Sequence, residues 1–128
     1  MSNKNVSRSW IALIMVVLFS SFSIEGLVKK FSPAGTWEYS VPGVQAGYEK
    51  GSMLIAEDGK DYKVTMVLNE YSKAEAEKVV YKKKAISFTI WVETEEILVT
   101  GSFDEDEFKG SLSYSEGDFS ITATRTTK

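Results

Sequence analysis

The stretch AGTWEYS, residues 34–40, lies where we expect the folded part of the chain to begin. The chain has three tryptophans, and one of them stands here, two residues after a glycine. Trp37, Tyr39 and Val41 are every second residue of this stretch, and every second residue of a strand points to the same face. The stretch therefore predicts a first strand over residues 35–41 whose apolar face includes Trp37.

The rest of the chain continues this alternation of apolar and polar residues, with turn signals about every ten residues. Acidic residues and glycines in EDGKD, FDEDEF and SEGD are typical of tight hairpins. We expect no helix of useful length, and YSKAEAEKVV is the one segment that could compete as a helix. We predict eight strands, at residues 35–41, 48–56, 61–68, 75–81, 85–93, 96–103, 107–114 and 118–125.

Each predicted strand has one apolar and one polar face. In the strand 85–93, Ile86, Phe88 and Ile90 oppose Ser87 and Thr89. This pattern is typical of an antiparallel sheet with one side on a core and the other in water. A membrane barrel needs longer strands and aromatic girdles. The predicted fold is therefore all-β, an eight-stranded antiparallel up-and-down β-barrel, with a β-sandwich as the alternative.

Closure of such a barrel brings the two ends of the folded chain together. Arg125 has the same parity as Ile121 and Ala123 at the end of the last strand. If the first and last strands pair antiparallel, Trp37 and Arg125 meet at one end of the interior. We expect the guanidinium to lie over the indole, with its donors on backbone carbonyls.

These residues also carry a family resemblance. Gly35, Thr36 and Trp37 at the start of the first strand, with Arg125 ending the last, resemble the signature of the calycins. That group includes lipocalins, fatty-acid-binding proteins and avidins, and in it these residues are structural. The resemblance covers about residues 33–126, and it implies a short lipocalin-like barrel with room for a small hydrophobic ligand.

The residues before the barrel have the pattern of a secretory signal peptide. Lys4 and Arg8 precede the apolar run WIALIMVVLF, and small residues stand at Ser21 and Ser23. The run is about ten residues long, whereas a spanning helix needs about twenty, so retention as an anchor is the weaker alternative. We expect a signal peptide over 1–23, a lead-in segment over 24–34 and a lipocalin-like barrel domain over 35–128. The mature protein would be secreted or periplasmic, without a membrane span.

Charge and missing residue types exclude several functions. Removing residues 1–23 changes the formal charge from 15 minus 18 to 13 minus 18, or -5. Such a surface repels phosphate, so we expect no nucleic-acid partner. The chain has no histidine and no cysteine, which excludes histidine triads, disulfides and common zinc or copper sites. Carboxylate pairs such as Glu93 with Glu95, or Glu38 with Glu49, stand where outward or turn residues are expected to be charged in any case. We therefore expect no catalytic residues, no metal and no cofactor.

Alternating hairpins also assign the loops to the two ends. EDGK, YKKKA and FDEDE fall at the Trp37 end, and VPGVQAG, NEYSKA, VETE and SEGD fall at the opposite, open end. A ligand would enter between 41–48 and 69–76, with Tyr71 at the rim. The same aromatic residues could instead simply fill the core. The predicted ligand-binding residues are Tyr39, Tyr48, Tyr62, Met66, Phe88 and Phe103.

Two functions follow from this fold. The first is a secreted or periplasmic lipocalin-like protein that binds a small hydrophobic ligand in the barrel interior. The alternative is a protein-interaction module, such as a periplasmic protease inhibitor that docks an unidentified partner through residues 24–33. An apolar cavity of about 300 Å³ or more favours the carrier, and a filled interior favours the interaction module.

Overall fold

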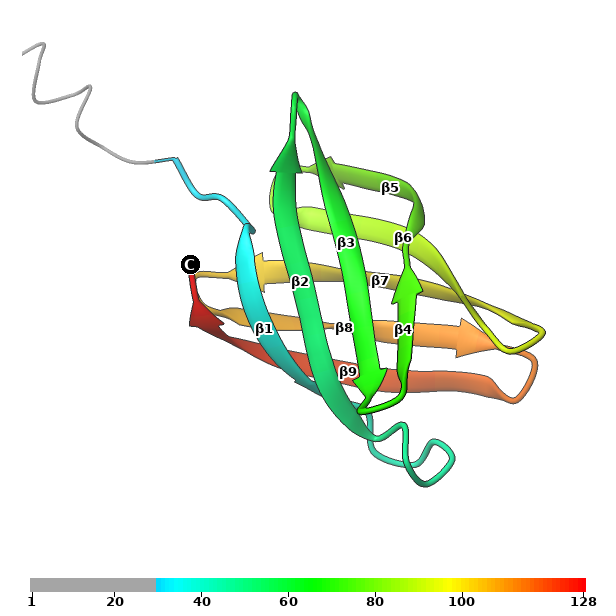
Figure 1. Cartoon of the computed structure of the whole chain (residues 1–128). Coiled ribbons are helices and arrows are strands. Elements are labelled where there is room, and N and C mark those ends of the chain that lie inside the picture. The colour runs from blue at the N-terminus through cyan, green and yellow to red at the C-terminus, as the bar shows by residue number, and fades with distance from the viewer. Residues whose placement is uncertain (1–29) are drawn as a thin grey trace, which may run out of the picture. The chain divides into compact units, whose positions relative to one another are not determined.

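The computed structural model describes residues 30–128, and these residues contain nine β-strands and no α-helix. The strands form one sheet in the order β4-β3-β2-β1-β9-β8-β7-β6-β5 (Figure 1). The described part of the chain has no helix that could span a bilayer. The predicted signal peptide and most of the lead-in segment lie outside the described residues. The strands are β1 (Gly35–Ser40), β2 (Lys50–Asp58), β3 (Asp61–Asn69), β4 (Ser72–Glu75), β5 (Glu77–Lys82), β6 (Ala85–Val92), β7 (Glu95–Asp104), β8 (Glu107–Tyr114) and β9 (Gly117–Thr127).

The all-β barrel prediction is confirmed, with one correction to the strand count. Seven of the eight predicted strands lie within two residues of their expected bounds. The prediction of a single fourth strand over 75–81 is wrong, because the segment divides at Ala76 into β4, which pairs with β3, and β5, which pairs with β6. The chain must bend there to join the two ends of the sheet. Lys78, with φ 53°, lies where the β5–β6 register shifts.

The sheet curls into a nearly closed barrel. β1 pairs antiparallel with both β2 and β9, so the first and last strands are neighbours. The backbone N–H of Ala76 donates to the carbonyl of Val64 over 2.9 Å. The rings of Tyr62 and Tyr81 meet edge to face with centroids 5.1 Å apart. These contacts bring β3 and β5 together where no ladder joins them, so the sheet encloses one interior instead of forming a sandwich.

Aromatic side chains fill the half of the interior near Trp37. Trp37 is completely buried, and its ring centroid lies 4.9 Å from that of Phe103. Phe103 packs in turn on Phe108, also at 4.9 Å, and on Tyr81 at 6.2 Å. We call this group, Trp37, Tyr62, Tyr81, Phe103 and Phe108, the aromatic plug. It leaves this end of the barrel closed by side chains.

Arg125 covers the aromatic plug, as the sequence predicts. Trp37 and Arg125 are directly paired across β1 and β9, and the guanidinium carbon lies 4.9 Å from the indole centroid. Its Nη1 donates to the carbonyls of Ser32 and Ala34 over 2.6 and 3.0 Å, and its Nε donates to Asp106 Oδ1 over 2.8 Å. The indole Nε1 donates to the carbonyl of Pro33 over 2.9 Å. The expected contact of Trp37 and Arg125 is therefore confirmed.

Candidate functional site

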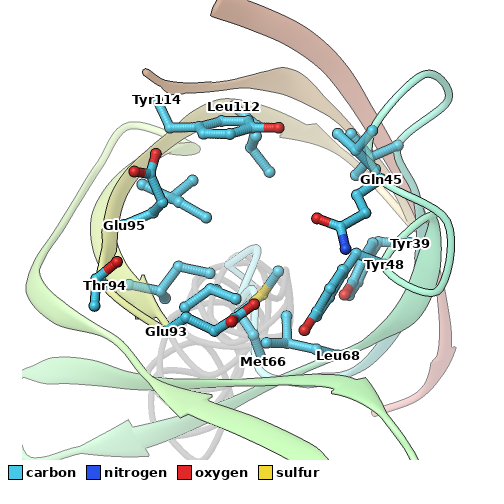
Figure 2. A pocket seen from close by; sticks show the side chains of 15 residues that line it. Tyr39, Gln45, Tyr48, Met66, Leu68, Glu93, Thr94, Glu95, Leu112 and Tyr114 are labelled. Carbon is cyan, nitrogen blue, oxygen red and sulfur yellow. The ribbon is translucent and has the colours of Figure 1, made fainter. Parts of the chain in front are cut away.

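The other half of the barrel contains a cavity of about 200 Å³. Figure 2 shows it ringed by strands and loops, with Leu68 and Met66 on one side and Leu112 and Tyr114 on the other. Its volume is below the value of about 300 Å³ that favours a carrier, yet the interior at this end is not filled. The described residues that line it are Tyr39, Val41, Val44, Gln45, Tyr48, Met66, Leu68, Ile90, Val92, Glu93, Thr94, Glu95, Ile97, Leu112 and Tyr114.

The loop between β1 and β2 forms one wall of the cavity. The backbone N–H of Val41 donates to the carbonyl of Glu49 over 2.7 Å and closes the base of the loop. Within it, the N–H of Tyr48 donates to the carbonyl of Gln45 over 3.1 Å. These bonds turn the loop back on itself, and the side chains of Gln45 and Tyr48 lie against the cavity (Figure 2).

The turn between β6 and β7 forms the facing wall. Val92 pairs with Glu95, so Glu93 and Thr94 make a two-residue hairpin, in which Glu93 has φ 57°. Glu95 accepts a hydrogen bond from the Ser115 hydroxyl, which ties this turn to the turn between β8 and β9. The polar side chains of Thr94 and Glu95 thus lie across the cavity from Gln45 and Tyr48, and Glu93 lies toward Met66 (Figure 2).

Tyr39 lies deeper in the wall, where Gly51 makes room for its ring. A Cβ on Gly51 would clash with the backbone oxygen of Val67 and would lie 2.6 Å from the Tyr39 hydroxyl oxygen, so only glycine fits at this position. Tyr39 is 4 % exposed. Burial of the hydroxyl raises the pKa of Tyr39 from 10.0 to about 12, because the phenolate would lose its hydration. Tyr39 is therefore a neutral polar group in the cavity wall at ordinary pH.

The raised pKa of Tyr39 predicts a loss of stability in alkaline solution. The neutral phenol favours the fold, so its contribution is complete below pH 10.0, the unfolded-state value, and is lost as the pH rises through about 12. We expect the free energy of unfolding to fall over this range by on the order of 1 to 3 kcal/mol, because each unit of pKa shift corresponds to about 1.4 kcal/mol. The Tyr39→Phe variant should lose less stability over this range when both proteins are unfolded with urea at each pH. Equal slopes for the two proteins would contradict the assignment.

The six predicted ligand-binding residues divide between the two halves of the barrel. Tyr39, Tyr48 and Met66 line the cavity. Tyr62 and Phe103 belong to the aromatic plug, and Phe88 is 1 % exposed and outside the cavity wall. The structure also corrects the expected entrance, because residues 92–95 take the place of residues 69–76 in the wall. Tyr71 is 91 % exposed and does not line the cavity.

Several residues of the wall were not predicted from the sequence, including Gln45, Glu95, Leu112 and Tyr114. Loop topology assigned the turns of Gln45 and Glu95 to the open end correctly. Alternation along the strand 107–114 placed Leu112 and Tyr114 on its inward face. Glu93 lies in the turn between β6 and β7, Glu95 is the first residue of β7, and both line the cavity. Alternation along a strand shows which side chains point inward. It does not show whether neighbouring side chains fill the space in front of them.

Comparison with known proteins supports the fold. No family model matches the sequence, and no curated protein matches it. The chain is similar to the solved structure of a redesigned beta barrel, with a TM-score of 0.54 and 16% sequence identity over 73% of this chain and 90% of that chain. At this identity the likeness shows the architecture alone. The molecule is an antiparallel β-barrel protein with one closed end and one hollow end.

Proposed function

We propose that this protein is a lipocalin-like carrier or sensor that binds a small, mainly apolar molecule in the hollow half of its barrel. The observation that carries the proposal is the cavity itself. Protein interiors are usually packed with few voids larger than a water molecule, and here about 200 Å³ is left open between aliphatic and aromatic side chains. A compact ligand fits this volume better than a drug-sized one, whose sites usually exceed about 300 Å³.

Calycin membership and export belong to the same proposal. The stacking of Arg125 on Trp37, with its donors on the carbonyls of Ser32 and Ala34, supports the resemblance in atomic detail. A rigid, closed end opposite a hollow end is also a suitable arrangement for a binding barrel. We further propose that the protein acts after export, and that it is not an enzyme.

The proposal predicts saturable binding of a neutral probe. Phenylbutanol combines an aromatic ring with a short chain and carries no charge, so burial of its apolar surface should drive binding. We expect isothermal titration calorimetry to give a defined affinity. Backbone amide shifts in an NMR titration should be largest in residues 44–48 and 92–97, which border the cavity.

A matched pair of variants tests the location of binding. Val44 lies on the loop that borders the cavity, so Val44→Trp should fill the space and weaken phenylbutanol binding at least about tenfold, or about 1.4 kcal/mol. Val80 is 61% exposed on β5, and Val80→Trp should leave binding unchanged. Equal phenylbutanol affinity of the wild type and Val44→Trp would show that the probe does not bind in this cavity, and would overturn the proposed function.

One observation favours the alternative function, a protein-interaction module on the same barrel. Trp91 on β6 and Leu98 on β7 are 49% and 45% exposed on the outer wall, on strands that pair directly. Exposed aromatic residues are typical of protein-binding surfaces. In that case Trp91→Ser should abolish partner binding and leave phenylbutanol binding intact.

A further inference from the structure

The charges of the cavity wall restrict the chemistry of its ligand. Glu93 and Glu95 line the cavity, and none of the described lining residues is a lysine or an arginine. A carboxylate ligand would bring a third negative charge to this wall with no cation opposite it. Like charges at close range in a partly desolvated site are unfavourable. The wall is therefore poorly suited to fatty acids and other organic anions.

Tyrosine side chains line the cavity together with the two carboxylates. Tyr48 and Tyr39 lie across the cavity from Glu95, Glu93 lies toward Met66, and Tyr114 lies between Glu95 and Gln45 (Figure 2). The face of an aromatic ring carries negative electrostatic potential and attracts an ammonium group within about 6 Å. Carboxylates and aromatic rings in the wall of one cavity therefore provide two kinds of attraction for the same positive charge.

The turns around the hollow end extend this negative field beyond the cavity. The segments 41–50, 69–73, 93–96 and 115–118 carry seven carboxylates and two lysines, an excess of five negative charges. A field of one sign around an opening raises the local concentration of oppositely charged ligands and speeds their association. The carboxylates are Glu49, Glu70, Glu93, Glu95, Glu96, Glu116 and Asp118, and the lysines are Lys50 and Lys73.

We propose that the ligand is a small organic cation, an ammonium group carried on a compact aromatic or aliphatic body. The body occupies the apolar space beside Met66 and Leu112. The ammonium group remains near the open end, between the carboxylates of Glu93 and Glu95 and the tyrosine rings. This inference rests on the proposed function, since it assigns a ligand class to the same cavity.

Three probes that share one carbon skeleton test the charge preference. Phenylbutylamine is a cation at pH 7, phenylbutanol is neutral and phenylbutyrate is an anion. We expect the amine to bind at least about tenfold more tightly than the alcohol, and the carboxylate more weakly than the alcohol. Added salt should weaken amine binding and leave alcohol binding nearly unchanged, because salt screens only the charged probe.

Variants then locate the charge preference. The double variant Glu93→Gln and Glu95→Gln keeps the size of both side chains, and a glutamine at 95 can still accept the Ser115 hydroxyl. We expect the ratio of amine to alcohol affinity to fall to about one, with alcohol binding retained. Glu96→Gln is the matched control, because it removes one charge from the same turn at a residue that does not line the cavity. The amine preference should persist in that control.

The outcomes separate this inference from the proposed function. If the alcohol binds and the amine shows no preference over it, the cation inference is wrong and the carrier proposal stands. The inference is also wrong if the carboxylate binds most tightly, or if the double variant keeps the full preference for the amine. If none of the three probes binds, both the carrier proposal and the cation inference are overturned.

Discussion

Replacement of Trp37 by alanine will lower the free energy of unfolding by about 4 kcal/mol, within the range for large aromatic truncations in cores. The indole is completely buried, packs on Phe103 and lies under Arg125. Its loss leaves a void at the closed end and removes the hydrogen bond to Pro33. A domain of this size has roughly 5–15 kcal/mol of total stability, so the variant will be close to unfolding. Urea unfolding followed by far-ultraviolet circular dichroism measures the change.

Two further variants separate packing from polar contacts at the closed end. Trp37→Phe keeps a ring against Phe103 and loses the bond to Pro33, and we expect a smaller cost of about 1–2 kcal/mol. Arg125→Met keeps an apolar side chain over the indole and leaves the carbonyls of Ser32 and Ala34 without their donor. A double-mutant cycle of Trp37→Phe with Arg125→Met should show coupling of at least about 0.5 kcal/mol. Full additivity would contradict the closed-end arrangement.

Substitution of Gly110 by alanine should cost about 3 kcal/mol, or prevent folding, although it adds a single methyl group. Gly110 faces Gly101 across β7 and β8, and a Cβ on Gly110 would lie 1.9 Å from the backbone oxygen of Thr100. The obstacle is backbone, so no side-chain rotation relieves it. Glycine in a strand interior commonly marks such a close approach or bend in a barrel. Thermal and urea unfolding of the purified variant measure the loss.

A substitution at the next residue provides the control for Gly110. Ser111 points to the outer face, where its hydroxyl lies 3.5 Å from that of Thr100 and is exposed. Ser111→Ala should change stability by no more than about 0.5 kcal/mol, as for most surface positions. If Gly110→Ala unfolds at the same urea concentration as Ser111→Ala, the backbone of β7 and β8 is less closely packed than the structure shows.

Much of the fold could be predicted because strands repeat every two residues. Alternation in segments such as AISFTIWVE predicted both the strand and its inward face, and Ile86, Phe88 and Ile90 are indeed buried. The fourth strand was mispredicted because EAEKVV does not alternate cleanly. Its division at Ala76 follows from the requirement to join β3 to β6, a constraint between segments that no local pattern contains.

The candidate site was only partly predictable, for a different physical reason. Alternation along the strands correctly predicted that Tyr39, Met66 and Phe88 point into the barrel. Tyr39 and Met66 line the cavity, whereas Phe88 is buried outside its wall. Whether an inward side chain is covered depends on the volumes of residues from several strands at the same level of the barrel. The aromatic plug fills one level, and mainly aliphatic residues leave space at the other.

The sequence by itself determined the strand period, the inward faces, the hairpin turns and the contact of Trp37 with Arg125, because each depends on residue spacing and on antiparallel pairing of the terminal strands. Only the tertiary structure decided that one half of the interior is hollow, and that Glu93, Glu95 and Tyr48 border the same cavity. These residues come from different loops. Their proximity depends on barrel curvature and on the hydrogen bonds that fold the loop 41–49 back on itself.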